Sequence, residues 1–373
     1  MTNRILRALV IKESLQIVRD PSSILISVVL PIILLFLYGF GVSLDIDHLR
    51  IGLVLEDTAP DAISFAKALT DSPYLEVKIA RDRRELMDDL TAGAIRGMVI
   101  VPSYFTQFRN RKDVIAPIQV IADGSEANTA NFVQNYTAGA FANWLEQEAI
   151  ARNVRGLPLV SAEPRYWYNE QLESRYFLLS GSLAIIMTLI GALLTALVVA
   201  REWERGTMEA LISTTISTRD LILGKVIPYF VLGMLSMAMC VFITVVLFGI
   251  PFRGSLLVLA GVSALFLFCS LGLGLMVSTI SKNQIFAYQI TLITAFLPAY
   301  ILSGFLFEIS SMPLWIQFLT LIIPAKYFVQ CLEALFLVGN VWPILLVNVM
   351  PMIVIGCIFF GITFKKTHKW LDQ

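Results

Sequence analysis

The sequence predicts a polytopic α-helical membrane protein with six transmembrane helices and an α/β extracytoplasmic domain inserted between helices 1 and 2. Composition supports this fold class: 57% of the 373 residues are apolar and 15% are charged, whereas soluble chains are about 45–50% apolar and about 25% charged. The charges are also unevenly placed, because residues 45–174 hold 13 of the 28 basic and 19 of the 28 acidic side chains. A soluble-looking block therefore interrupts a series of apolar segments.

Six apolar segments are long enough to cross a bilayer core, which needs about 20 residues of helix. They comprise residues 22–44, 176–200, 226–250, 255–280, 285–307 and 343–364. A further apolar stretch, 312–338, contains Pro313, Pro324, Lys326 and Glu333. We interpret it as short helices that break at Pro324 and enter the outer half of the membrane without crossing it, because irregular backbone at that depth must be covered by protein.

The positions of Lys and Arg predict the orientation, because short cytoplasmic loops carry an excess of them. Only Arg253 and Lys326 lie in short loops assigned to the outer face. The short cytoplasmic segments hold Arg4, Arg7, Lys12, Arg19, Arg201, Arg205, Arg219, Lys225, Lys282, Lys365, Lys366 and Lys369. Both termini are therefore expected on the cytoplasmic side.

The chain accordingly divides into an N-terminal amphipathic helix at 1–21, transmembrane helix 1 at 22–44, a periplasmic α/β domain at 45–174 and the remaining helices at 175–373. This last region includes a cytoplasmic loop at 201–225 and outer short helices at 308–340. We expect transmembrane helix 1 to be retained as an anchor, because no small-residue cleavage site precedes Asp45.

The outer block alternates strand-like and helix-like segments. Residues 50–55, 74–80, 97–101 and 117–122 have the pattern of strands, and residues 61–69, 83–91 and 126–152 have that of helices. This alternation predicts a parallel or mixed sheet. Asp123-Gly124-Ser125 is interpreted as a turn and helix cap, with a ligand site at the strand ends as the alternative. The aromatic segments Arg165–Tyr168 and Tyr176-Phe177 fit either an interfacial belt or a substrate gate.

Several functions are excluded by what the sequence lacks. With 28 basic and 28 acidic residues, the chain has no net charge to attract nucleic acid. It contains neither a CxxC pair nor a His cluster for a metal, and no GxxxxGK[ST] motif to cradle ATP phosphates. The transmembrane segments carry no charged residue near their middles, whereas ion relays depend on such groups. We therefore expect no catalytic residue, no cofactor bound by this chain and an external energy source.

The loop at 201–225 is the most informative cytoplasmic segment. Arg201–Arg205 carries opposite charges three or four residues apart, a spacing that stabilises helices. Gly206 interrupts this helix, and Thr207 can cap a second short one. Leu211-Ile212 would leave apolar side chains facing the cytoplasm or the bilayer surface. The segment is either a solvated helical hairpin or a stiff lever for a cytoplasmic partner.

Small and weakly polar residues form one face of the second and of the fifth transmembrane segment. We interpret these faces as packing surfaces, because small residues let helices approach closely in lipid. The alternative is a substrate pathway between two subunits, with the candidate residues Thr188, Gly191, Thr195, Tyr288, Gln289, Ala295, Ala299 and Ser303.

Together, several motifs resemble the permease subunits of ABC-2-type exporters, in the bacterial multidrug-type branch that has a large periplasmic domain. The most specific of them is Arg201–Leu211, with the sequence REWERGTMEAL. The resemblance extends over essentially the whole chain and also rests on Lys12-Glu13, Val18–Pro21, Val99–Phe105, Ala116–Asn128, Leu297–Pro313 and Pro324–Val329.

The resemblance implies a non-enzymatic six-helix subunit in the bacterial inner membrane. It would pair with itself or with a sister permease, and each half would rest on a separate ATPase subunit that binds ATP and Mg. Residues 1–21 would form a connecting helix. An outer gate would include Met312, Pro313, Pro324 and Tyr327. Coupling to the ATPase would involve Arg201, Glu202, Trp203, Glu204, Arg205, Gly206, Thr207, Met208, Glu209 and Leu211.

The weakly polar transmembrane faces fit a hydrophobic or amphiphilic substrate, drug-like or lipid-like, exported from the cytoplasm or the inner leaflet. The outer domain would contact either a periplasmic adaptor or the substrate. Two alternatives stay open. One is a stand-alone secondary carrier, against which the absence of intramembrane charges speaks. The other is a membrane-anchored receptor that uses the outer α/β domain.

Overall fold

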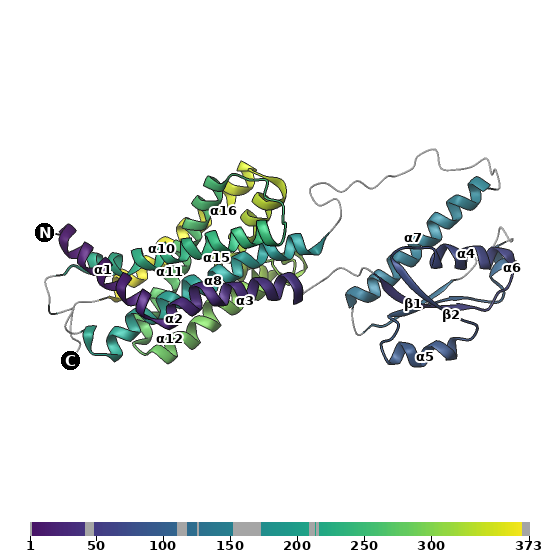
Figure 1. Ribbon diagram of the computed structural model, residues 1–373, viewed down its shortest axis with the longest axis horizontal. Coiled ribbons are helices and arrows are strands. Elements are labelled where there is room, and N and C mark those ends of the chain that lie inside the picture. Colours follow the sequence, from purple (N-terminus) through teal and green to yellow (C-terminus); the bar gives the residue numbers. More distant parts are fainter. Residues whose placement is uncertain are drawn as a thin grey trace. The chain divides into compact units, whose positions relative to one another are not determined.

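The computed structural model describes residues 2–41, 48–109, 118–124, 127–151, 173–208, 213 and 216–367. The chain divides into two compact units, one comprising Met1–Leu44 and Arg165–Gln373 and the other Asp45–Pro164. Within the described residues, six helical segments are long and apolar enough to cross a membrane, and a four-stranded sheet lies between the first and the second of them in the chain. The predicted fold class is confirmed (Figure 1).

The membrane unit begins with α1 (Thr2–Arg19), followed by a first spanning segment that is made of four consecutive helical pieces. These pieces are α2 (Pro21–Ile24), η1 (Leu25–Val29), α3 (Leu30–Phe36) and η2 (Leu37–Gly41). The later spanning segments are α8 (Ser174–Glu204), α10 (Thr218–Phe242) with η3 (Ile243–Leu247), α11 (Leu256–Ser281), α12 (Gln284–Thr291) with η4 (Leu292–Phe296) and α13 (Leu297–Leu302), and α16 (Trp342–Lys366).

Helix α8 is the core of the membrane unit. In its most apolar window 94% of the residues are buried, against 56% for α11 and 33% for α10. A helix that is hydrophobic on all sides belongs in an interior, and α8 packs against α11, α15 (Pro324–Glu333), α12 and α10. The helical segments also reach further than the sequence predicts, because α8 continues to Glu204 and α10 already begins at Thr218. The loop predicted at 201–225 is correspondingly shorter.

The apolar stretch before α16 is broken, as predicted. After η5 (Ile309–Ser311), α14 (Leu314–Thr320) meets the pair α15 and η6 (Ala334–Val338) at 83°. The break falls just before Pro324, which is the first residue of α15. A proline disfavours helical backbone in the residue before it, and Ile323 is accordingly extended, with φ −93° and ψ 112°.

The unit Asp45–Pro164, which the sequence predicts to lie outside and which is called the outer unit below, is a four-stranded mixed sheet with helices on both faces (Figure 1). In chain order it contains β1 (Leu49–Leu55), α4 (Pro60–Thr70), β2 (Leu75–Ala80), α5 (Arg83–Thr91), β3 (Gly97–Val101), α6 (Phe105–Arg109), β4 (Gln119–Ala122) and α7 (Ala127–Ala151). The strand order is β2-β1-β3-β4; β1 runs parallel to β2 and β3, and β4 runs antiparallel to β3. Each strand predicted from the sequence is present, whereas the short helix α6 was not predicted.

Two apolar cores lie on the two faces of this sheet. One contains Phe65 of α4 and Trp144 of α7, and the other contains Leu86 of α5 and Ile95. Helices α4 and α7 therefore share one face, and α5 covers the other (Figure 1). The predicted cap residue Ser125 and the aromatic segment at 165–168 lie outside the described residues.

Candidate functional site

Three buried charged side chains and the partly exposed Lys12 form a cluster, called the four-charge cluster below, where α1, α8 and α10 meet. Glu13 of α1, Glu202 of α8 and Lys225 of α10 are 2%, 5% and 3% exposed. Lys225 Nζ donates to Glu13 Oε1 at 2.9 Å and to Glu202 Oε1 at 3.2 Å. Lys12 Nζ completes the cluster, because it lies 2.5 Å from Glu202 Oε1 and 3.2 Å from Glu13 Oε1. Two carboxylates thus face two ammonium groups, and burial is tolerated because each charge is paired.

A second ion pair closes the same end of the bundle. Arg201 Nη1 donates to Asp20 Oδ2 at 2.9 Å. Asp20 also caps the first spanning segment, since it accepts hydrogen bonds from the backbone N–H of Ser22 at 3.3 Å and from the Ser23 hydroxyl at 2.8 Å. Arg201 therefore ties the end of α8 to the turn that joins α1 to α2.

Both pairs shift the pKa of a group that lies outside the spanning segments. Burial opposes the charge of Lys12, but hydrogen bonds and attraction to Glu202 and Glu13 outweigh it and raise the pKa of Lys12. Burial likewise opposes ionisation of Asp20, but the Ser23 hydroxyl and the Arg201 guanidinium hold the pKa of that carboxyl below its usual value.

The expectation that the charges of Arg201–Arg205 pair with one another is wrong for Arg201, Glu202 and Glu204. Glu204 accepts the backbone N–H of Gln284 at 2.8 Å and also binds its side-chain amide, at the start of α12. Trp203 lies under the Lys282 ammonium, 4.6 Å from the ring centroid. The physical reason is packing: the last turn of α8 contacts α1, the turn after it and α10 through the buried Arg201 and Glu202, and the start of α12 through Glu204, so these side chains pair with neighbouring elements.

The remaining candidate coupling residues follow the end of α8. Gly206 has φ +70°, the left-handed conformation that suits glycine after a helix end. The Thr207 hydroxyl donates to the Glu202 carboxylate, so this residue folds back onto the cluster. Met208 is buried, with 3% of its surface exposed. Glu209 and Leu211 lie outside the described residues.

Two candidate pathway residues, Gly191 and Thr195, are packed against α11. A Cβ atom on Gly191 would lie 2.6 Å from the Ser270 Cβ, and one on Gly274 would lie 2.1 Å from the Ala192 carbonyl oxygen. Thr195 Oγ1 donates to the Leu271 carbonyl at 2.9 Å. Small residues on both helices therefore allow this close contact.

Three other candidate pathway residues, Thr188, Ala295 and Ala299, line a cavity of about 550 Å³. Its walls come from α8, α11, the fifth spanning segment, Phe359 of α16 and the bend between α14 and α15, where Pro324 and Ala325 begin α15. The further lining residues are Ser270, Leu273, Met276, Val277, Ile280, Ser281, Ile290, Thr294, Pro298, Leu302, Leu319, Ile322 and Ile323. No charged side chain is among them.

The other candidates lie apart from this cavity. Tyr288 and Gln289 are exposed on α12, and Ser303 is buried, with its Oγ accepting the Phe305 backbone N–H at 3.3 Å. Of the candidate gate residues, Tyr327 donates from its hydroxyl to the Leu321 carbonyl at 2.9 Å and so stabilises the bend before α15.

Of the remaining gate candidates, Pro324 lies at this bend, whereas Met312 and Pro313 precede α14. Pro324 lines the cavity. The Met312 carbonyl accepts the Gln317 amide at 2.8 Å, and Pro313 immediately precedes α14.

Sequence reasoning missed the pairing of Glu13 with Lys225. A signal was present: Leu9, Glu13 and Ile17 are four residues apart, so they share one face of α1. An acidic residue on an apolar stripe must meet a cation if that stripe is buried. Identifying that cation required the tertiary structure. Within the described residues no group of His, Cys, Asp and Glu could hold a metal ion.

Comparison with known proteins adds to this geometry. A protein-family sequence model described as "ABC-2 family transporter protein" matches residues 21–365. The chain is 50% identical over 369 residues to "Probable multidrug ABC transporter permease YbhS" of Escherichia coli K12, covering 99% of this chain and 98% of the relative.

Two further relatives from Escherichia coli K12 are more distant. "Probable multidrug ABC transporter permease YbhR" is 26% identical over 357 residues, covering 91% of this chain and 94% of the relative. "Inner membrane transport permease YhhJ" is 29% identical over 298 residues, covering 76% of each chain.

Proposed function

This chain belongs to the ABC-2 family of transporter proteins, and from that membership we propose that it is the permease subunit of an exporter for hydrophobic or amphiphilic substrates. Drug-like or lipid-like molecules leave the cytoplasm or the inner leaflet, and a separate ATPase subunit supplies the energy. The observation that carries the proposal is the four-charge cluster of Lys12, Glu13, Glu202 and Lys225, because it fixes the end of the most buried helix to its neighbours.

In this proposal the ATPase acts on the segment Arg201–Leu211, and α8 transmits the movement. The helix is continuous from Ser174 to Glu204 and contains no proline. Thr188, which lines the cavity, precedes Glu202 by 14 residues, or about 21 Å along a helix that rises 1.5 Å per residue. A tilt imposed at the four-charge cluster would therefore reshape the cavity.

The cavity supports the proposed substrate class. Its lining is apolar apart from four hydroxyl groups and backbone, and two of these hydroxyls are already bound within their own helices. Thr188 donates to the Ala184 carbonyl at 2.7 Å, and Thr294 donates to the Ile290 carbonyl at 2.8 Å. A charged ligand would lose its hydration there without meeting a charge of opposite sign, so the site favours uncharged or weakly polar molecules that can bond to the Ser270 and Ser281 hydroxyls.

Location and partners belong to the same proposal. The chain would lie in the bacterial inner membrane with both termini in the cytoplasm, consistent with the name of the relative YhhJ. It would pair with itself or with a sister permease, since two permeases named in the same way, YbhS and YbhR, both match it. The unit Asp45–Pro164 would engage a periplasmic adaptor or the substrate.

Reconstitution tests the proposal. The permease, co-expressed with candidate ABC ATPase subunits, should retain one of them through purification, and the complex in liposomes should extrude a fluorescent amphiphile when ATP is added. ATPase activity should rise with amphiphiles and not with sugars or inorganic ions. Transport by the permease alone, driven by an ion gradient and indifferent to any ATPase, would contradict the proposal.

A charge reversal that tests coupling should be made at Glu204, because the structure makes Glu202 unsuitable. Glu202→Lys would place a third ammonium group against Lys12 and Lys225, so loss of folding would be indistinguishable from loss of coupling. Glu204 lies at an exposed contact with Gln284. Glu204→Lys should leave the protein in the membrane and reduce transport per ATP hydrolysed.

A further inference from the structure

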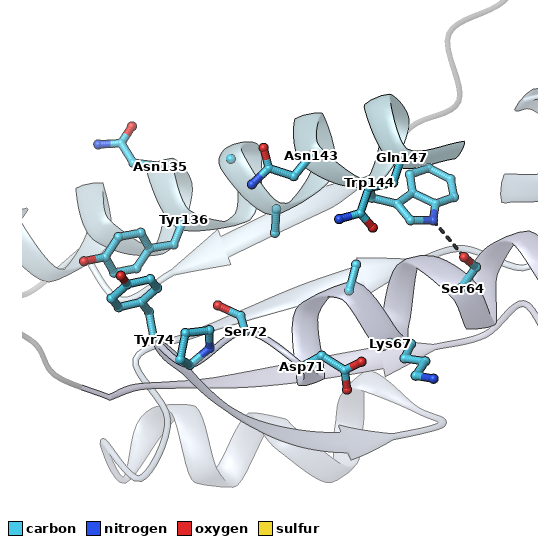
Figure 2. Close-up of a pocket in the computed structure, with 14 residues that line it drawn as sticks. Ser64, Lys67, Asp71, Ser72, Tyr74, Asn135, Tyr136, Asn143, Trp144 and Gln147 are labelled. Carbon is cyan, nitrogen blue, oxygen red and sulfur yellow. Dashed lines mark hydrogen bonds between the residues drawn. The ribbon is translucent and has the colours of Figure 1, made fainter. Parts of the chain in front are cut away.

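The outer unit contains a groove of about 690 Å³ between α4 and α7 that the transport cycle described above does not use. At one end the rings of Tyr74 and Tyr136 stack with centroids 6.0 Å apart and an angle of 24° (Figure 2). At the other end the Trp144 indole N–H donates to the Ser64 hydroxyl at 3.0 Å. Concave sites of this size with aromatic walls and a few polar groups are typical of small-molecule binding.

The aromatic wall is preformed and still accessible. Tyr74 keeps 59% of its surface exposed although its ring rests on Tyr136. A tyrosine with its ring held by a neighbour loses little conformational freedom when a second ring stacks on it. Tyr74 therefore offers a fixed flat surface to a ligand.

The polar lining is balanced in charge. Lys67 lies on α4 and Asp71 directly follows its last residue, and Asn143 and Gln147 project from α7 on the opposite side (Figure 2). Among the described residues the structure shows no hydrogen-bonding partner for either amide. Each amide can both donate and accept, and one cation beside one anion gives the groove no net charge. The lining therefore suits an uncharged ligand that carries hydroxyl or amide groups.

Gly139 places no side chain in the middle of the groove. This glycine lies inside the 25-residue helix α7, and a Cβ added to it would meet nothing within 4 Å. Glycine inside a helix is less favourable than alanine, and no neighbouring atom among the described residues requires it. Its effect on the surface is to leave space between Tyr136 and Asn143, where a side chain would otherwise project.

We propose that this groove is a binding site for an uncharged amphiphile with a flat ring, which stacks on Tyr74 while its polar groups bond to Asn143 and Gln147. The physiological role of this site rests on the proposed function. In that function the cavity lined by Thr188 binds the apolar part of the same molecule, whereas the groove binds its ring and its polar groups. Binding itself needs neither ATP nor the ATPase.

The test uses the full chain in nanodiscs without ATP or ATPase. The probe is 4-methylumbelliferyl β-D-glucoside, which is uncharged, flat-ringed and hydroxyl-bearing, and its Kd is measured by fluorescence titration. Tyr74→Ala should weaken binding about 2- to 12-fold, the ratio equivalent to one aromatic contact. Gly139→Leu should abolish binding without lowering the unfolding temperature, because leucine is a better helix former.

Tyr104→Ala is the matched control. Tyr104 is also exposed, at 43%, and contacts an aromatic neighbour, Phe108, in the same unit, but it does not line the groove. This variant should bind the probe like the original chain. Gly139→Ala is a second control, because alanine stabilises the helix as leucine does but adds only a methyl group to the groove. This variant should retain most of the binding.

Two results would overturn the proposal. One is that the original chain, Tyr74→Ala and Gly139→Leu all bind the probe with the same Kd, or that none of the three binds it. The other is binding of methyl β-D-glucoside alone but not of 7-methoxy-4-methylcoumarin, because the ligand would then be a sugar and not a flat-ringed amphiphile. Loss of ATP-driven transport with intact probe binding would contradict the proposed function and leave the groove assignment standing.

Discussion

Removing one charge from the four-charge cluster should destabilise the protein far more than removing a matched pair. Lys225 lies 2.9 Å from Glu13 and 3.2 Å from Glu202. At an effective dielectric constant of about 20, each contact corresponds to an attraction of about 5–6 kcal/mol before desolvation. Breaking a buried pair costs about 3–5 kcal/mol net, because the partner charge is left uncompensated. Lys225→Met should therefore lower the free energy of unfolding by that amount.

The double variant Lys225→Met/Glu13→Leu should be more stable than Lys225→Met alone. It removes one cation and one anion, and the remaining Lys12–Glu202 pair at 2.5 Å stays neutral. Replacing a buried pair by apolar residues is often close to neutral, so most of the stability lost in Lys225→Met should return. The second substitution should stabilise the protein, although it deletes another contact.

The assay is unfolding of the purified full chain in mixed micelles with increasing SDS. Lys365→Met is the control: Lys365 is an exposed residue in the last turn of α16, and this change should stay within about 0.5 kcal/mol of the original chain. Equal losses for Lys225→Met and Lys365→Met, or a double variant less stable than Lys225→Met, would refute the reasoning that paired charges hold the three helices together.

Three further predictions follow from single contacts. Gly274→Ala should destabilise the α8–α11 contact, since its Cβ would lie 2.1 Å from a backbone carbonyl oxygen. On the same helix, a Cβ at Gly261 meets nothing within 4 Å, so Gly261→Ala should be neutral or stabilising. Thermal unfolding of the two variants distinguishes these outcomes. The lowered pKa of Asp20 means that its contribution to stability is present above its unfolded pKa, about 3.9, and is lost as pH falls through the lower folded value. The stability difference between the original chain and Asp20→Asn should therefore shrink from pH 5 to pH 3, and a constant difference would contradict this. Thr188→Leu should reduce stimulation of the partner ATPase by bulky amphiphiles more than by small ones, because it fills the cavity; an unchanged profile would exclude the cavity as the substrate site.

Hydrophobic periodicity predicted the secondary structure well because both units follow it closely. The strands predicted at 97–101 and 50–55 match β3 and β1, and the break at Pro324 follows from the geometry of proline. The limits of α8 and α10 were less accurate, because their charged ends look like loop sequence. In the structure Arg201–Glu204 continues the helix, and its charged side chains bind residues of neighbouring elements.

Sequence alone determined that apolar spanning segments and a charged α/β domain make up the chain, and in which order. Apolar length and the distribution of charge are local properties that every compatible fold must satisfy. Tertiary structure decided which small residues pack and which line a cavity: Gly191 and Thr188 lie on one helix, yet the first contacts Ser270 and the second lines the cavity. It also decided that Glu202 is held by Lys12 and Lys225, from two other helices. The physical reason is that pairing of a buried charge depends on elements far apart in the chain, which only packing brings within a few ångströms.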